Sequence, residues 1–328
     1  MRVAVFNSKD YDKESLGAYR GEHEFVFFRP ALDEHSVAMA RGFDAVCCFV
    51  NDDVGTAVVE ALAELGVKLI AMRCAGYNNV DLEAAKARGI TVCRVPEYSP
   101  HTVAEHAVAL IMDLNRNIHR AFNRIRENDY SLQGLQGFEI HGKTVGVIGT
   151  GIIGSTFANL MSGFGCRILG YDPGQNERFA KIGDYVELDK LLNESDIVSL
   201  HCPLLPATRH IVNADSINKM KDGVMIINTS RGALVDTPAV IDALKTGKVG
   251  WLGLDVYEDE AGLFFEDNSN RILTDDVLAR LLTFPNVVIT GHQAFFSREA
   301  LKTIADTTIA NVEAFAEQRL EEKNTVSV

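Results

Sequence analysis

Arg231, Glu260 and His292 each stand a few positions beyond an apolar run that predicts a buried strand. In a parallel sheet the strands end along one edge, and ligands bind outside that edge. An arginine placed there can hold a carboxylate through two parallel hydrogen bonds, while a histidine can exchange a proton near neutral pH. The three residue types are therefore the ones that reduction of a 2-oxo acid needs.

Each of the three also has a structural explanation when it is taken alone. An arginine after a strand is usually a surface or ion-pair residue, an acidic run such as YEDE is usually a solvated loop, and a histidine is usually hydrogen-bonded within the fold. Their shared placement, downstream of a glycine-rich loop, favours the functional interpretation. On that interpretation Arg231 binds the substrate carboxylate, and Glu260 keeps His292 protonated as the proton donor.

The glycine-rich loop, GTGIIG at 149–154, predicts a dinucleotide site. It follows an apolar strand and precedes a helical pattern, and Asp172 ends the next strand at the spacing of the dinucleotide fingerprint. Gly149 would make the tight turn, Gly151 would let the backbone approach a pyrophosphate, and Gly154 would let helix and strand pack closely. Asp172 would accept hydrogen bonds from the ribose hydroxyls and repel a 2′-phosphate, which predicts NAD rather than NADP. A solvated acid in the turn YDPG is the alternative explanation of Asp172.

The bulk composition limits the partners and the compartment. The 328 residues exceed what one core usually serves, and 47% hydrophobic residues suffice for two cores. The net charge of −13 repels phosphate backbones and anionic lipids, so no nucleic-acid or membrane role is expected. The chain shows no secretory pattern at its N-terminus and no apolar run of membrane length, and its six cysteines lack metal-binding spacing. We therefore expect a cytoplasmic protein without a bound metal.

Strand-like and helical patterns alternate along the chain. They predict an α/β fold of two Rossmann or flavodoxin-like domains, each with a doubly wound parallel sheet, and a cleft between the domains. Residues 1–99 and 297–328 are expected to form a discontinuous substrate domain, and residues 100–296 the NAD-binding domain. Residues 98–101 are interpreted as a hinge before one long helix over 102–128. The strands are expected at 3–7, 24–28, 45–50, 68–74, 91–95, 144–149, 166–172, 196–201, 224–228, 251–257 and 286–290.

Longer motifs give the sequence a resemblance to a known family. RCAGYNNVDL, VPEYSP, VIGTGIIG, NTSRGALVD, LDVYEDE and GHQAF occur in this order at family-like spacing. With them the sequence resembles the D-isomer-specific 2-hydroxyacid dehydrogenases from end to end, and most closely their bacterial fermentative D-lactate branch. The resemblance implies that Arg231 binds and polarises the substrate, that Glu260 tunes the histidine and that His292 donates the proton.

The resemblance also implies contacts that the residues alone would not indicate. Backbone amides near Ala75 and Gly76 would help to hold the carboxylate, and Tyr98 and Phe295 would face the substrate. Phe295 stands where some D-lactate enzymes have tyrosine, so the polarity of that position stays open. The remaining cofactor contacts implied are Ile152, Ile153, Cys202, Pro203, Thr208, Thr229, Ser230 and Asp255.

Three functions remain to be separated. The first expectation is NAD-dependent, reversible reduction of pyruvate to D-lactate, and AGLFFEDNSN after Glu260, where many relatives have proline, fits that branch. A broader D-2-hydroxyacid dehydrogenase acting on bulkier 2-oxo acids would keep the chemistry and change the pocket. An NADH-sensing, corepressor-like binding protein would share the fold and the three residues, although the acidic charge and the lack of extra tails argue against it. The long helix and the habit of the family predict a homodimer or homotetramer.

Overall fold

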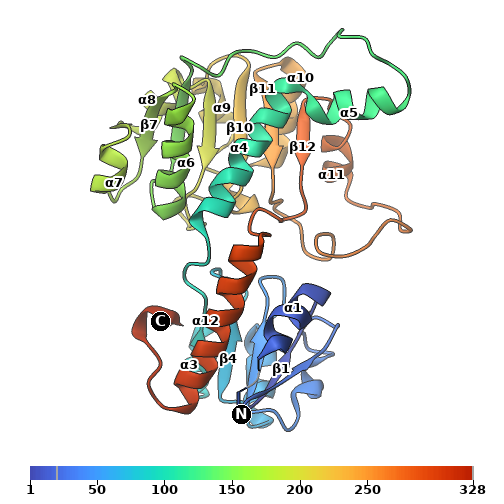
Figure 1. The fold of residues 1–328 in the computed structure, drawn as a ribbon, viewed down its shortest axis with the longest axis vertical. Coiled ribbons are helices and arrows are strands. Elements are labelled where there is room, and N and C mark those ends of the chain that lie inside the picture. The colour runs from blue at the N-terminus through green and yellow to red at the C-terminus, as the bar shows by residue number, and fades with distance from the viewer. Residues whose placement is uncertain (20, 327–328) are drawn as a thin grey trace. The chain divides into compact units, whose positions relative to one another are not determined.

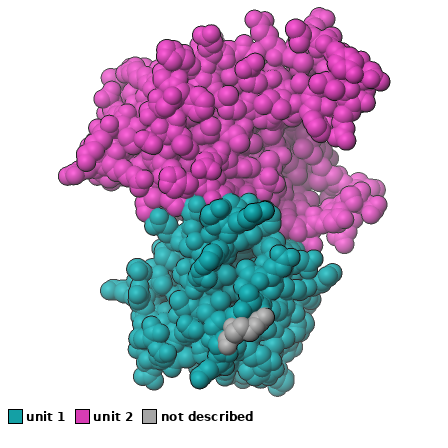
Figure 2. Space-filling view, viewed as in Figure 1, with its two compact units in different colours: residues 1–99, 296–328 teal, residues 100–295 magenta. Residues whose placement is uncertain are grey.

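The computed structural model describes residues 1–19 and 21–326 (Figure 1). Contacts between Cα atoms divide the chain into two compact units, which Figure 2 shows in teal and magenta. Unit 1 contains residues 1–99 and 296–328, and unit 2 contains residues 100–295. The chain therefore passes between the units twice. Within the described residues, no helix combines the length and the apolar character needed to cross a bilayer.

Unit 1 is built on a six-stranded sheet with the order β13-β5-β4-β3-β1-β2. Neighbouring strands pair in parallel, except that β13 runs antiparallel to β5. The central strands β3 and β4 are buried at every position, as their unbroken apolar sequences require. The strands are β1 Arg2–Val5, β2 Glu24–Phe27, β3 Ala45–Cys48, β4 Leu69–Met72, β5 Thr91–Cys93 and β13 Thr325–Val326.

The last long helix of the chain, α12, belongs to unit 1, where it packs on β4 and beside α1 (Figure 1). Ala305 and Val312 of this helix share a core cluster with Val3, Cys47 and Leu69 of the sheet. The amphipathic pattern of the helix is thus explained by the apolar sheet face that it covers. The helices of unit 1 are α1 Asp10–Ser15, η1 Leu16–Ala18, η2 Val37–Ala40, α2 Thr56–Glu64, α3 Leu82–Ala87, α12 Arg298–Ala316 and η4 Glu322–Asn324.

Unit 2 contains a seven-stranded, wholly parallel sheet with the order β12-β11-β10-β9-β6-β7-β8. The chain starts at β6, builds outward to β8 and then returns to β9 on the other side of β6. This reversal between β6 and β9 is the switch point at which open α/β sheets bind their ligands. The strands are β6 Thr144–Ile148, β7 Arg167–Tyr171, β8 Asp184–Tyr185, β9 Ile197–Leu200, β10 Val224–Asn228, β11 Val249–Leu254 and β12 Val287–Ile289.

Helices cover both faces of this second sheet. One core cluster joins α4 and α6 to the sheet, and another joins α8, α9, α10 and α11 to it (Figure 1). The prediction of an α/β fold with parallel, doubly wound sheets is confirmed. The helices of unit 2 are α4 Pro100–Arg116, α5 Ile118–Arg126, α6 Ile152–Gly163, α7 Glu177–Ala180, α8 Leu188–Glu194, α9 Ala214–Lys219, η3 Gly232–Leu234, α10 Thr237–Thr246 and α11 Asp276–Leu281.

The single long helix expected over 102–128 is wrong. The helix starts earlier, at Pro100, because the first turn needs no N–H from its leading residue. It then breaks at Asn117, whose φ of 51° is left-handed, and α5 continues from the next residue. Asparagine tolerates this conformation better than most residues do. Two expected hinge residues, Pro100 and His101, are therefore helical.

Candidate active site

The carboxyl ends of three neighbouring strands of unit 2 present Arg231, Glu260 and His292. Arg231 follows β10, Glu260 follows β11 and His292 follows β12, and these strands are adjacent in the sheet. Parallel pairing brings their ends to one edge. Residues far apart in the sequence thus reach the same side of unit 2.

His292 and Glu260 are in direct contact. Nδ1 of His292 lies 2.7 Å from Oε1 of Glu260, and the two side chains are 15% and 21% exposed. A carboxylate at Nδ1 fixes the tautomer and leaves Nε2 as the nitrogen that exchanges protons with a ligand. The ring of Phe265 packs against the imidazole, with the ring centroids 5.4 Å apart. The imidazole is therefore oriented on two sides.

His292 itself has a strained backbone, with φ of 54°. Its N–H donates to the carbonyl oxygen of Asp255 at 2.7 Å. The fully buried carboxylate of Asp255 accepts hydrogen bonds from Gln293 N at 2.9 Å and Ala294 N at 2.8 Å. A left-handed histidine persists only where its surroundings hold it, and such residues cluster at functional sites. Asp255 supplies that support, which sequence reasoning missed because nothing in the motif shows where its oxygens point.

Arg231 lies in an extended turn that reaches the loop carrying Glu260. Its Nη1 donates to the carbonyl oxygen of Ser230 at 2.7 Å, and its own carbonyl oxygen accepts from Asn228 Nδ2 at 2.8 Å. A Cβ on the next residue, Gly232, would lie 2.1 Å from the backbone of Tyr257, so only glycine lets the two loops approach this closely. No carboxylate among the described residues forms an ion pair with Arg231. Its charge is thus left for an anionic ligand.

The glycine-rich loop has the geometry of a phosphate site. Gly149 has φ of 92°, and a Cβ there would lie 2.4 Å from Cys202 N. A Cβ on Gly154 would lie 2.0 Å from the carbonyl oxygen of Gly149, so helix α6 packs directly on the turn. Gly151, at the N-terminus of α6, faces open space instead, with no atom within 4 Å of a Cβ built on it. Free N–H groups of a helix end can therefore meet a phosphate at this point.

Asp172 follows β7 and supports the same loop. Its Oδ2 accepts a hydrogen bond from Thr150 N at 2.7 Å, and its Oδ1 accepts one from Gly174 N at 2.9 Å. Asp172 also lines a pocket with seven other residues: Tyr171, Pro173, Gln175, Tyr185, Val186, Glu187 and Lys190. The acid therefore lies where the loop meets a pocket, as a ribose-binding acid must.

The other expected cofactor residues gather at the ends of β6, β9 and β10. Ser230 Oγ donates to the carbonyl oxygen of Cys202 at 2.7 Å, and Thr208 Oγ1 donates to that of Pro203 at 2.6 Å. The hydroxyl oxygen of Thr229 is buried without a hydrogen-bond partner in the described part of the chain. A buried hydroxyl without a partner, at the carboxyl end of β10, indicates that a ligand completes the site. Ile152 and Ile153 open helix α6 directly after Gly151.

A second cluster lies at the carboxyl edge of the unit 1 sheet, after β4. Ala75 and Gly76, expected at the substrate carboxylate, belong to this edge, and Tyr98 follows β5 in the same unit. Phe295, expected to face the substrate, is the last residue of unit 2 and is 8% exposed.

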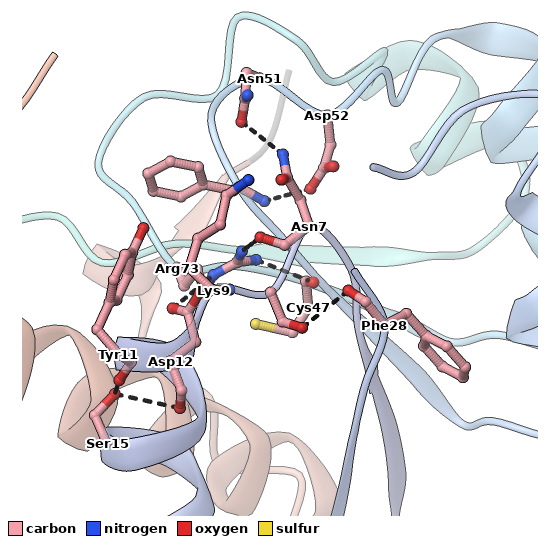
Figure 3. A network of polar contacts seen from close by, with 12 residues as sticks. Asn7, Lys9, Tyr11, Asp12, Ser15, Phe28, Cys47, Asn51, Asp52 and Arg73 are labelled. Atoms are coloured by element: carbon pink, nitrogen blue, oxygen red, sulfur yellow. Dashed lines mark hydrogen bonds and ion pairs between the residues drawn. The ribbon is translucent and has the colours of Figure 1, made fainter. Parts of the chain in front are cut away.

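Arg73, which directly precedes this loop, is only 1% exposed (Figure 3). Its Nε lies 3.2 Å from Asp12 Oδ1, its Nη2 donates to the carbonyl oxygen of Asn7 at 2.9 Å, and its Nη1 reaches that of Cys47 at 3.4 Å. Burial alone would lower the pKa of Arg73, but the charge of Asp12 raises it, so the guanidinium stays charged. Through these contacts Arg73, which follows β4, is joined to helix α1, to the segment after β1 and to strand β3.

Sequence reasoning missed Arg73 and Asp12. Arg73 follows an apolar strand just as Arg231 does. This pattern in the sequence could have indicated that Arg73 has a specific role. Among the described residues, no cluster of three or more histidine, cysteine, aspartate or glutamate residues could hold a metal ion.

Comparison with known proteins gives these sites a family. The model described as "D-isomer specific 2-hydroxyacid dehydrogenase, NAD binding domain" matches residues 108–294. The chain is 51% identical over 324 residues to 2-hydroxyacid dehydrogenase A of Aspergillus oryzae, with 97% of this chain and 93% of the relative covered. It is also 51% identical over 315 residues to D-lactate dehydrogenase of Escherichia coli (strain K12), with 95% and 96% covered.

A solved structure agrees with these sequence relatives. The structure titled "Identification of the pyruvate reductase of Chlamydomonas reinhardtii" matches with a TM-score of 0.90 and 46% identity, and 97% of each chain is covered. These likenesses run over nearly the whole chain and include the domain that binds the dinucleotide. The protein is an NAD-binding oxidoreductase that belongs to the D-isomer specific 2-hydroxyacid dehydrogenase family.

Proposed function

We propose that this protein is an NAD-dependent D-lactate dehydrogenase that reduces pyruvate reversibly to D-lactate. The observation that carries the proposal is the 2.7 Å contact between His292 and Glu260, on strand ends adjacent to the one that presents Arg231. A proton donor and an anion-binding fork on one edge of a dinucleotide domain match the two needs of 2-oxo acid reduction. Relatives named for D-lactate and pyruvate support this substrate.

In the proposed mechanism Arg231 binds the carboxylate of pyruvate through its guanidinium and so orients the neighbouring carbonyl. NADH, which the glycine-rich loop and Asp172 would hold, would supply the hydride for the carbonyl carbon. His292 gives the proton on Nε2 to the carbonyl oxygen, which completes the hydroxyl group of lactate. Glu260, at Nδ1, stabilises the imidazolium before the transfer. In the reverse direction His292 accepts the hydroxyl proton.

We assign the substrate domain to unit 1. The backbone amides at Ala75 and Gly76 would share the carboxylate with Arg231, and Tyr98 and Phe295 would border the methyl group. Arg73, two residues before Ala75, is itself held in place by its three contacts with Asp12, Asn7 and Cys47. Unit 2, residues 100–295, would bind NAD through Gly149, Gly151, Gly154 and Asp172, with the smaller contacts at Ile152, Ile153, Cys202, Pro203, Thr208, Thr229, Ser230 and Asp255.

The assay that tests this function is NADH oxidation over a panel of pyruvate, phenylpyruvate and 2-oxoisocaproate. We expect the highest kcat/KM with pyruvate, and D-lactate as the product. A higher kcat/KM with the bulky acids would instead establish the broader D-2-hydroxyacid dehydrogenase. Absence of turnover with every acid would reject the enzyme mechanism and favour an NADH-sensing protein.

Arg231→Lys is expected to raise the KM for pyruvate about 10- to 100-fold, because lysine cannot make the two parallel bonds of the guanidinium. The KM for NADH should change little, since Arg231 is assigned to the substrate. Initial rates over a range of pyruvate concentrations measure this effect. Arg167→Lys is the matched control, because Arg167 begins β7 and pairs with Glu194 on the surface. An unchanged pyruvate KM in Arg231→Lys would mean that another group holds the carboxylate.

Asp172→Ala is expected to raise the ratio of kcat/KM with NADPH to that with NADH about 10- to 100-fold, because it removes the charge that repels a 2′-phosphate. The KM for NADH should also rise, since Oδ2 of Asp172 holds Thr150 N in the glycine loop. Asp189→Ala, which removes an exposed acid paired with Lys219, is the control and should keep the cofactor ratio. A ratio that stays at the wild-type value in Asp172→Ala would remove Asp172 from cofactor selection.

We further propose that the protein acts in the cytoplasm as a homodimer or homotetramer. Its cysteines are unpaired, and burial raises the pKa of Cys47 to about 11, which suits thiols that stay reduced. Ile118, Phe122 and Ile125 of α5 are each more than half exposed and lie on one helix face. The same helix face of a second copy of the chain would cover these three side chains. Sedimentation equilibrium measures the number of subunits.

A further inference from the structure

Arg94 lies just after β5 and directs its charge at the loop expected to hold the substrate carboxylate. Its Nη1 donates a hydrogen bond to the carbonyl oxygen of Ala75 at 3.0 Å. The guanidinium also stacks on Tyr77, with 5.0 Å between its central carbon and the ring centroid. Among the described residues no carboxylate forms an ion pair with Arg94. The hydrogen-bond acceptor of the Arg94 guanidinium is therefore the backbone carbonyl oxygen of Ala75.

The rest of unit 1 fixes Arg94 in this position. Its backbone N–H donates to the carbonyl oxygen of Asn324 at 2.8 Å, and its carbonyl oxygen accepts from Nδ2 of Asn311 at 2.9 Å. Asn324 Nδ2 in turn donates to Asn311 Oδ1 at 2.8 Å, and Asn311 is 2% exposed on α12. The Nε of Arg94 is buried without a partner in the described residues, a cost in stability that favours a functional explanation.

The loop itself contains unused hydrogen-bond donors. Within the described chain, no residue accepts a hydrogen bond from the backbone N–H of Ala75 or of Gly76, although Gly76 is buried. Buried backbone N–H groups are nearly always paired. Two adjacent unpaired donors at the carboxyl edge of a parallel sheet therefore indicate an anion that the loop binds.

Arg94 and the donor at Gly76 are joined by one peptide group. The carbonyl oxygen of Ala75 and the N–H of Gly76 share the electrons of the same amide. A charged donor at the oxygen draws electron density from the nitrogen and makes its N–H a stronger hydrogen-bond donor. The same contact stops the peptide from rotating away from its ligand.

We propose that Arg94 is a positioning residue for the substrate carboxylate, which fixes the Ala75–Gly76 peptide and strengthens the Gly76 N–H as a donor. This inference rests on the proposed function, because it takes the anion at Gly76 to be the carboxylate of the 2-oxo acid. Arg94 does not touch the substrate in this scheme.

Arg94→Met is expected to raise the KM for pyruvate about tenfold and the inhibition constant of the pyruvate analogue oxamate in parallel. The kcat and the KM for NADH should stay within about twofold of wild type, because the proton donor and the dinucleotide loop are in unit 2. Arg94→Lys, which keeps a charged donor, should recover part of the lost affinity. Arg88→Met is the control, since Arg88 pairs with Glu60 on the surface and should leave all constants unchanged.

A pyruvate KM and an oxamate constant within twofold of wild type in Arg94→Met would overturn the inference. So would an equal loss of affinity for NADH and for oxamate in both Arg94 variants, because that pattern indicates general damage to the fold. If Arg94→Met does not fold, Arg94→Lys decides by the same two constants. A wild-type enzyme without activity on any 2-oxo acid would instead reject the proposed function.

Discussion

His292→Gln is expected to lower kcat for pyruvate reduction about 10²- to 10⁴-fold and to leave the affinity for NADH nearly intact. Glutamine can still donate a hydrogen bond to Glu260, but its neutral amide is too weak an acid to give a proton to the carbonyl oxygen. NADH affinity should survive because His292 stands after β12, beyond the glycine loop at β6. Stopped-flow or steady-state NADH oxidation gives kcat, and fluorescence titration gives the NADH dissociation constant.

His141→Gln is the matched control for this variant. His141 lies exposed before β6, at the opposite edge of the same sheet, so kcat should be that of wild type. His201 does not replace the missing acid, because desolvation lowers its pKa to about 3 and keeps it neutral near pH 7. Wild-type turnover in His292→Gln would therefore remove the proposed proton donor.

Arg73→Met is expected to lower the free energy of unfolding of unit 1 by about 3–5 kcal/mol, the usual effect of leaving one partner of a buried ion pair alone. The carboxylate of Asp12, 7% exposed as a side chain, would lose its cation, and two backbone carbonyls would lose their donors. Urea denaturation followed by circular dichroism measures the loss. Arg88→Met, which breaks an exposed pair with Glu60, should cost less than about 1 kcal/mol.

The double variant Asp12→Asn with Arg73→Met separates charge from packing. Removing both charges should restore part of the stability, because the uncompensated carboxylate is gone. A single variant Arg73→Met as stable as Arg88→Met would contradict the structural role given to this pair.

Much of unit 2 could be predicted from sequence because its signals are local. The run Val224–Asn228, apolar up to its last residue, appears as a strand with those bounds, since strands buried on both faces have nearly continuous apolar sequences. The glycine-rich loop could also be predicted from the sequence, because its glycines follow a recognisable spacing. In the structure a Cβ on Gly149 or on Gly154 would clash with nearby backbone atoms. The placement of Arg231, Glu260 and His292 needed only the rule that parallel strands end on one edge.

Other features depend on contacts that no local pattern records. The pair of Arg73 and Asp12 joins residues 61 positions apart, and the hydrogen bond from Arg94 to Ala75 depends on how two strands lie side by side. The break at Asn117 interrupts a helical pattern without proline or glycine, so periodicity alone favoured continuation. β8 and β13 contain two residues each, too few for alternation or an apolar run to show.

The bounds of β11 also differ from the prediction because of a contact that no local pattern records. The run predicted at 251–257 is apolar except for Asp255, and β11 stops at Leu254, the residue before it. Asp255 leaves the ladder because its carboxylate holds the backbone after Thr290, and Val256 and Tyr257 are buried by the loop rather than by strand pairing. Apolar character predicted the burial correctly and the secondary structure incorrectly.

A crystal structure of the complex with NADH and oxamate is the most direct measurement of the central claim, that Arg231 binds the carboxylate of a 2-oxo acid whose carbonyl oxygen His292 protonates. We predict the oxamate carboxylate within about 2.7–3.2 Å of the guanidinium of Arg231 and of the N–H of Gly76. The oxygen of the keto-like carbonyl should lie within the same distance of Nε2 of His292. Oxamate bound elsewhere, or His292 out of reach of it in a closed complex, would contradict the account.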